Sequence, residues 1–291
     1  MTANSRTTSR FLAVSQRMGS ELRRSRLATF GLVATVLLVV VGIAAPVLAP
    51  LDPLEIDVPN RFARPSLRHP FGTDRFGRDI LSRVIYGARI SLLVGFISVI
   101  LGLVIGVPLG AIASYTGGVF DGVVMRLMDA VLAFPSIMLA LLLRFALGPS
   151  IGSVMAAIGI IRIPVFARTV RSSVLGEREK EYVMAARAIG QGRLGILFRH
   201  ILPNALAPLI VLVTVLFANA LLIEAAMSFL GIGTPPPQPS WGTMLNDGRE
   251  FMQNHPQVVL FPGLAISVMV LGINLLGDGL RDILDPRILY Q

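Results

Sequence analysis

Long apolar runs separated by short polar segments dominate the chain. The runs are each about twenty residues long, the length that an α-helix needs to cross roughly 30 Å of hydrocarbon. They lack the period-two alternation of a barrel strand, so membrane helices are favoured over a β-barrel. The membrane-spanning segments are expected at residues 27–49, 90–114, 121–147, 150–170, 204–232 and 258–280.

The polar segments complete the organisation. A basic tail, residues 1–26, precedes the first span, and a second tail, residues 282–291, follows the last one. The first span, residues 27–49, is too long for the core of a cleaved signal peptide and is interpreted as a retained anchor. Residues 50–89 separate it from a core of five spans at residues 90–281. The predicted fold class is an all-α polytopic membrane protein.

The placement of arginine predicts an orientation. The tail before the first span carries six arginines, and the loop at residues 171–203 is also basic. Because basic loops stay in the cytoplasm, both termini are expected there. Residues 50–89, 148–149 and 233–257 then face outward. Residues 50–89 do not fit the rule that basic segments stay in the cytoplasm, since they hold seven arginines and only five acidic residues.

Composition and charge narrow the class of function. The chain is 54% hydrophobic with a net charge of +9, and Lys180 is its only lysine. No aromatic-interleaved basic patch accompanies this charge, so it indicates anionic lipid rather than nucleic acid. With no cysteine, thiolate chemistry is excluded. HExxH, Gly-x-Ser-x-Gly and GxxxxGK[ST] motifs are absent from the sequence, so neither catalysis nor a bound cofactor is expected of this chain.

One polar stretch between two spans, EYVMAARAIGQGRLGILFRHILPN at residues 181–204, predicts a short helix. Tyr182, Ala185, Ala186 and Ile189 recur at helical spacing and share one face. The flanking charges, Glu181 and Arg187, project elsewhere.

The end of this helix is also predicted. Gly190 is expected to stop it in a left-handed conformation, and a second helical piece is expected at residues 193–200. Pro203 suits the first turn of the next membrane helix. By these residues alone, the stretch either lies on the membrane surface as an amphipathic helix or docks onto a cytosolic partner.

The stretch is similar to the EAA loop of ABC-importer permeases, with the pattern Glu-Ala-Ala, three residues, Gly, nine residues, Ile-x-Leu-Pro. The residues on this spacing are Ala185, Ala186, Gly190, Leu202 and Pro203. Met184 replaces the usual Glu and His200 the usual Ile. We name residues 181–203 the EAA-like segment, the main part of a coupling loop at about residues 177–203. The resemblance implies docking onto an ATPase, through Glu181, Tyr182, Ala185, Ala186, Arg187, Ile189, Gly190, Leu202 and Pro203.

Four further stretches resemble the C-type permease subunit of dipeptide and oligopeptide importers. They are HPFGTDRFGRDILSRVIYGARISL (69–92), RLMDAVLAFPS (126–136), EAAMSFLGIGTPPPQPSWGTML (224–245) and NLLGDGLRDILDPR (274–287). The resemblance implies a six-helix type I ABC-importer permease in the bacterial inner membrane. It also implies a homologous B-type permease subunit, two ATPase subunits that use ATP and Mg, and an extracytoplasmic binding protein. Close relatives also move nickel or other small cargo, and a stand-alone secondary transporter is the alternative class.

Polar residues inside the spans are candidates for the translocation path or a gate, because burying them in lipid is expensive. They are Arg144, Glu224, Ser228, Asn274 and Asp278. Glu224 and Arg144 are expected to pair or to line the outer gate, and a purely structural pair is the alternative. Asn274, Asp278 and Arg281 form a stripe for which local ion pairing is favoured over an inner gate.

Other positions predict packing and local structure. Gly102, Gly106 and Gly110 indicate tight helix packing. Arg126 and Asp129 are expected to pair locally, whereas Arg162 needs a partner or a water-filled cavity that the sequence does not identify.

The segment before the second span, residues 50–89, is expected to hold an amphipathic helix. It runs from about Arg75 to Ile90 with a cap from Thr73 or Asp74, and its arginines serve either the binding protein or lipid head groups. In the later polar segment, Trp241 is a candidate anchor at the membrane interface.

Overall fold

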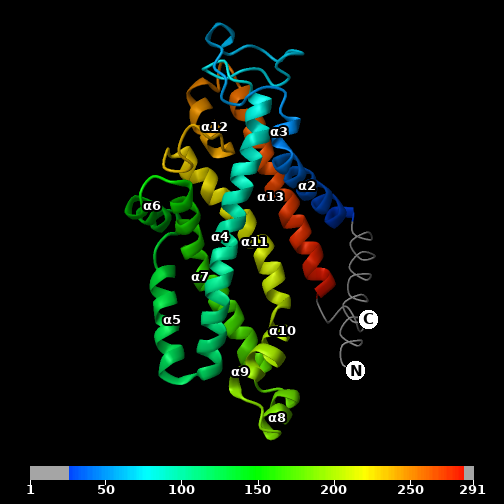
Figure 1. Ribbon diagram of the computed structural model, residues 1–291, viewed down its shortest axis with the longest axis vertical. Coiled ribbons are helices and arrows are strands. Elements are labelled where there is room, and N and C mark those ends of the chain that lie inside the picture. Colours follow the sequence, from blue (N-terminus) through cyan, green and yellow to red (C-terminus); the bar gives the residue numbers. More distant parts are fainter. Residues whose placement is uncertain (1–25, 285–291) are drawn as a thin grey trace.

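The computed structural model describes residues 26–284, so most of both predicted tails lies outside the described residues. Five helices in this range are long and apolar enough to cross a membrane. They are α2 (Arg26–Ile43), α4 (Ile80–Thr116), α7 (Ile151–Glu177), α11 (Ala207–Phe229) and α13 (Gln257–Leu284). Apart from the inclined α2, they extend along the long axis of the molecule (Figure 1). The predicted helical class and five of the predicted spans are confirmed.

The remaining expected span, residues 121–147, is not one straight helix. It consists of α5 (Gly118–Leu132) and α6 (Ser136–Leu147), which meet at 94°. Pro135 sits at the break with an extended ψ of 128°. Its ring removes the backbone N–H and restricts the preceding residue, so the helix cannot continue through it. This pair is a broken span or a re-entrant element.

Helix α4 begins at Ile80, later than the start expected near Arg75, and it ends at Thr116, just past the expected span at 90–114. Its N-cap is Asp79, whose carboxylate accepts from the backbone N–H of Ser82 at 2.7 Å. Asp74 accepts instead from the N–H groups of Phe76 and Arg78, in a turn that precludes a helix there. The predicted start and cap of the helix at residues 75–90 are therefore wrong. The helix begins at Ile80 and continues directly into the span.

Helices α4 and α7 pack closely on each other, and the tight packing that the glycines of α4 predict is confirmed. A Cβ added at Gly106 would lie 2.5 Å from the carbonyl oxygen of Ile163, and one at Gly102 would lie 2.6 Å from the Cβ of Arg162. Only a residue without a side chain permits this approach of the two backbones. Helix α2 packs on α13 in the same way, because Gly31 lies against the backbone of Gly272.

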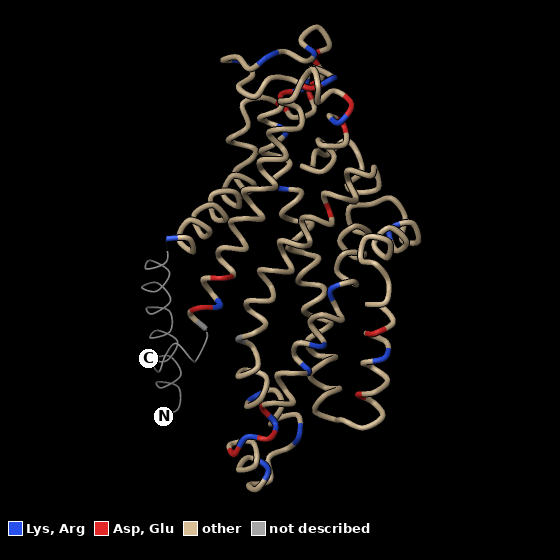
Figure 2. The backbone as a smooth tube through the Cα atoms, turned by 180° about the vertical axis from the view of Figure 1, so that it is seen from behind, with Lys and Arg blue, Asp and Glu red and all other residues tan. Residues whose placement is uncertain are grey.

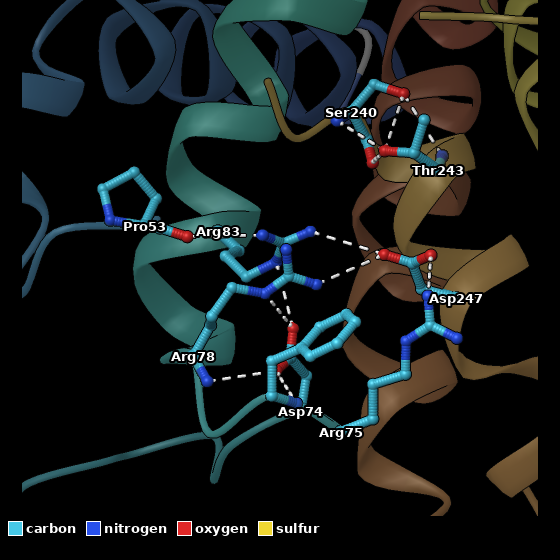
Figure 3. A network of polar contacts seen from close by, with 9 residues as sticks. Pro53, Asp74, Arg75, Arg78, Arg83, Ser240, Thr243 and Asp247 are labelled. Atoms are coloured by element: carbon cyan, nitrogen blue, oxygen red, sulfur yellow. Dashed lines mark hydrogen bonds and ion pairs between the residues drawn. The ribbon is translucent and has the colours of Figure 1, made fainter. Parts of the chain in front are cut away.

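At one end, residues 50–79 form a cap with two short helical elements, α12 (Trp241–Gly248) and η3 (Arg249–Phe251). The cap segment also contains η1 (Val58–Asn60), and α3 (Ala45–Leu48) leads into it. Asp74 and Asp247 pair there with three arginines, Arg75, Arg78 and Arg83 (Figure 3). Those arginines therefore bind carboxylates of their own chain, where the sequence suggested lipid or a partner.

Trp241 lies inside this end of the molecule. Its side chain is fully buried, and its Nε1 donates to the backbone oxygen of Val84 on α4 at 2.9 Å. The expectation of an interface anchor is wrong, since the indole packs α12 against α4. Figure 2 shows most of the charged positions gathered toward the two ends of the molecule, as expected of a protein with an apolar middle.

Candidate functional site

The EAA-like segment forms a compact projection beyond the end of α7, at the opposite end from the cap (Figure 1). It contains α8 (Glu181–Ala188), α9 (Arg193–Ile196) and a π-helical turn, η2 (Leu197–Ile201). The short helix α10 (Leu202–Ala205) then leads into α11. The predicted helix–turn–helix layout is confirmed. Pro203 lies in the first turn of α10, however, and not in the membrane helix itself.

Gly190 makes the turn between the two helical pieces. Its φ of +76° is left-handed, a conformation that glycine adopts without steric cost. The N–H of Gln191 donates to the carbonyl of Ala186 at 3.1 Å, and the N–H of Gly190 donates to that of Arg187 at 3.0 Å. These two bonds form a Schellman motif, which satisfies carbonyls that a helix end leaves without partners. The predicted left-handed stop is confirmed.

A hydrogen-bonded ring closes the base of the projection. The hydroxyl of Tyr182 donates to a carboxylate oxygen of Glu177, at the end of α7, at 2.5 Å. The side-chain amide of Asn204, on α10, donates to the same hydroxyl at 3.3 Å and to the carbonyl of His200 at 2.7 Å. Partial burial and the bond to Glu177 raise the pKa of Tyr182 above its usual value. The end of α7, which enters the projection, and α10, which leaves it, are thereby linked through Tyr182.

The inner face of the projection belongs to the main hydrophobic core. Val183 and Ala186 on α8 are buried together with Ile196, Leu197 and Ile201. The sequence grouped Ala186 with Tyr182, Ala185 and Ile189 on one face, but Ala186 points inward while the other three are exposed. Val183 was missed because it lies outside that periodic set. Its spacing of three residues from Ala186 was the available signal.

The outer face of the projection exposes apolar side chains. The exposed fractions are 53% for Met184, 83% for Ile189, 64% for Leu194 and 45% for Phe198. Exposed apolar side chains of this kind are typical of a contact with another protein or with the membrane. Of these four residues, the sequence assigned only Ile189 to docking. Met184, at the position of the usual Glu, adds an exposed apolar side chain in place of a charge.

The predicted gate residues do not form one site. Glu224 and Ser228 lie together on α11, and the Ser228 hydroxyl donates to Glu224 at 2.8 Å. Arg144, on α6, donates instead to the carbonyl of Gly148. The proposed pair of Glu224 with Arg144 is absent from this structure. Asn274 and Asp278 are exposed on α13, and Asp278 forms no ion pair with Arg281 or with another residue within 26–284, so the local ion pairing favoured for that stripe is wrong.

Two other arginines of the spans pair with carboxylates on a neighbouring helix, and a third has unpaired nitrogens among the described residues. Asp129 pairs with Arg168 of α7 rather than with Arg126, and this corrects the predicted local pair. Asp121 receives a bidentate contact from Arg171, with the shortest bond at 2.6 Å. Arg162 is only 7% exposed, and its Nε and Nη2 have no hydrogen-bond partner among the described residues. Within residues 26–284 no group of three or more acidic, histidine or cysteine side chains is placed to hold a metal ion.

These observations define a class of protein. Helices of membrane-spanning length carry a self-contained cap at one end and an apolar projection at the other, as in a permease that works with a partner. The family described as "Binding-protein-dependent transport system inner membrane component" matches residues 106–290. The chain belongs to this family. A second match, "N-terminal TM domain of oligopeptide transport permease C", covers residues 15–65.

Curated relatives agree over most of the chain. It is 48% identical to the dipeptide transport system permease protein DppC of Alkalihalophilus pseudofirmus, over 92% of this chain and 88% of that protein. It is 44% identical to the glutathione transport system permease protein GsiD of Escherichia coli, over 91% of this chain and 88% of that protein.

A solved structure shares the fold. The MetNI methionine ABC transporter, in an inward-facing conformation, aligns with a TM-score of 0.59 at 20% identity. The match covers 70% of this chain and 97% of the other. This supports the type I importer permease fold.

Proposed function

We propose that this chain is the permease subunit of an ATP-driven importer of short peptides. It forms half of the translocation path beside a homologous B-type subunit. An extracytoplasmic binding protein delivers the cargo, and two cytosolic ATPase subunits, or one fused ATPase, supply the energy. The peptide cargo is supported by relatives named for dipeptide transport at 48% identity and for glutathione, itself a tripeptide, at 44%.

The observation that carries this proposal is the exposed apolar face of the EAA-like segment. Ile189 and Leu194 extend from a projection whose base is closed by Tyr182 and Asn204. A lipid-lying amphipathic helix needs its apolar face at the bilayer, but this projection lies beyond the end of the spanning helix α7. A groove on a cytosolic ATPase fits the exposed face better than lipid does.

The cap supports a division of labour between the two ends. Its buried arginines form ion pairs with Asp74 and Asp247. These pairs hold the cap segments together at the end predicted to face the binding protein. ATP and Mg are assigned to the partner subunits because the family resemblance implies it and this sequence has no GxxxxGK[ST] loop. This chain then supplies contact and movement. Movement of the ATPases would be passed to the spans as a rigid-body rotation. The predicted path residues Asn274 and Asp278 remain a prediction.

Co-purification tests the proposal. The chain is co-expressed with its companion subunits, and the amount of ATPase retained on the purified chain is measured. The double variant Ile189→Ser/Leu194→Ser is expected to retain at most about a tenth of the ATPase, an effect of roughly 1.4 kcal/mol or more on binding. Leu67→Ser is the matched control, because Leu67 is fully exposed at the cap end.

Two outcomes would overturn the proposal. One is wild-type retention of the ATPase by the double variant. The other is peptide accumulation by the chain reconstituted alone in vesicles without ATP, which is the behaviour of a secondary transporter.

A further inference from the structure

A buried carboxylate on α11 has no charged partner. Glu224 is 1% exposed, and no lysine or arginine within residues 26–284 forms an ion pair with it. Burying an isolated carboxylate costs far more than a fold tolerates unless hydrogen bonds replace its hydration. Three hydroxyls supply them. One carboxylate oxygen accepts from Ser91 at 3.1 Å, and the other accepts from Ser228 at 2.8 Å and Thr234 at 3.3 Å.

The serine hydroxyls also hold the chain that follows α11. The Oγ of Ser91 accepts from the backbone N–H of Trp241 at 3.3 Å, and the Oγ of Ser228 accepts from that of Thr234 at 3.2 Å. A hydroxyl has one proton to donate. With that proton donated to Glu224, the lone pairs of each serine oxygen are free to accept from the loop. Glu224 thus orients the two hydroxyls that hold the loop.

Close packing makes this connection stiff. A Cβ added at Gly242 would lie 2.7 Å from the Cα of Ala225 and from the Cβ of Ser228, so α12 rests directly on α11. The indole of Trp241 fastens the same helix to α4. At its far end, α12 carries Asp247, which joins the arginine network of the cap (Figure 3). Loop 231–240 and α12 thus connect the cap to one end of α11.

The other end of α11 adjoins the EAA-like segment. The helix begins at Ala207, directly after α10, whose Asn204 belongs to the ring at the base of the projection. With 23 residues, α11 is about 35 Å long. A helix of this length, fixed at both ends, carries a displacement as a rigid element.

We propose that Glu224 is a positioning residue that couples the cap to the EAA-like segment through α11. We name the three hydroxyls of Ser91, Ser228 and Thr234 on Glu224 the clamp. When a partner docks on the cap, the clamp makes α11 move with the cap. The movement reaches the EAA-like segment and changes the turnover of the ATPase bound there. This inference rests on the proposed function. It assigns Glu224 and Ser228 to this clamp and not to a gate lining, since both side chains are buried in the hydroxyl cluster.

Glu224→Gln breaks the clamp with little change in size. The amide nitrogen donates where a carboxylate oxygen accepted, so at least one hydroxyl can no longer donate to residue 224 and must turn away, which weakens its hold on the loop. The complete complex is reconstituted in lipid nanodiscs, and ATPase turnover is measured with and without binding protein loaded with a mixture of synthetic di- and tripeptides. We expect basal turnover within about twofold of wild type and at least a fivefold loss of stimulation by the binding protein.

Two further variants sharpen the test. Ser91→Ala removes one hydroxyl of the clamp, with its bonds to Glu224 and to the N–H of Trp241. We expect an intermediate loss of stimulation, which provides a readout if Glu224→Gln does not assemble. Ser267→Ala is the matched control, because that hydroxyl bonds only to Gly263 of its own helix.

The outcomes separate this inference from the proposed function. Wild-type stimulation in Glu224→Gln and in Ser91→Ala would overturn the clamp. A parallel loss of basal turnover, assembly and stimulation would also overturn it, because the residue would then be only structural. A wild-type complex that no binding protein stimulates would contradict the proposed function instead.

Discussion

The cap and the EAA-like segment differ in whether their charged or apolar side chains find partners within the chain. In the cap, buried charges are matched within the chain: Arg78 bonds to Asp74 at 2.7 Å and to Asp247 at 3.3 Å. In the EAA-like segment, the polar groups at the base are satisfied, but Ile189 and Leu194 extend into the surroundings. One end matches its charges within the chain, and the other leaves apolar side chains exposed, which the proposed function assigns to contact with an ATPase.

This difference shows how the two ends divide stability and function. Removing one member of a buried ion pair leaves an uncompensated charge, so changes in the cap act on folding. Exposed side chains contribute little to folding, so changes on the outer face of the projection act on binding. The comparison therefore predicts which assay responds to which variant.

The largest effect is expected for Asp74→Ala in the cap. Asp74 accepts from two backbone N–H groups and from Arg78, and Arg83 lies beside it at 3.5 Å. Its loss leaves the almost fully buried Arg83 short of one carboxylate. Stability should fall by about 3–5 kcal/mol. Thermal unfolding of the purified chain in detergent measures this, with exposed Arg61→Ala as a control expected within about 0.5 kcal/mol of wild type. An equal loss of stability in Asp74→Ala and Arg61→Ala would contradict the view that the matched charges of the cap act on folding.

A smaller effect is expected for Gly190→Ala at the turn of the projection. A side chain at a φ of +76° costs about 1–2 kcal/mol, although nothing lies within 4 Å of the added Cβ. The strain should loosen the Schellman turn and reduce retained ATPase while the spans stay folded. Hydrogen exchange of residues 181–203 and co-purification measure the two effects.

Gly192→Ala is the matched control for that variant. Gly192 has a φ of −64° and equally open space, so it accepts a side chain without strain. Faster exchange in both variants alike would show that loss of glycine, and not the left-handed turn, is the cause.

The smallest effect is expected for Tyr182→Phe at the base of the projection. The lost hydroxyl removes bonds to Glu177 and Asn204, worth about 0.5–1.5 kcal/mol. Because the pKa of Tyr182 is raised in the folded protein, its neutral form is favoured there. The contribution is therefore complete below the ordinary pKa near 10 and is lost as pH rises through the higher folded value.

A pH series of thermal unfolding checks this last prediction. The wild type should lose its advantage over Tyr182→Phe above about pH 10. An advantage that is unchanged at alkaline pH would contradict the hydrogen-bond explanation and leave only packing of the ring.

Much of the site was predictable because its signals are local. The left-handed turn at Gly190 follows from one glycine after a short periodic helix, and the tight contact of α4 with α7 follows from three glycines at spacings of four. A kink at Pro135 was predictable from a proline inside the expected span, but its size of 94° was not, because apolar composition measures the length of a span and not its direction. The start of α4 was misplaced because Asp74 and Asp79 are both good caps, and only the turn around Gly77 decides between them.

The sequence by itself determined the membrane class, the positions of the spans and the existence of a polar projection, because hydrophobic length and helix period are properties of neighbouring residues. Tertiary structure decided which charges are matched and by what. Ser91 meets Glu224 across 133 residues of chain, and Arg75 meets Asp247 across 172. Short-range patterns cannot choose among many possible donors and acceptors, since the choice depends on which helices the packed core brings together.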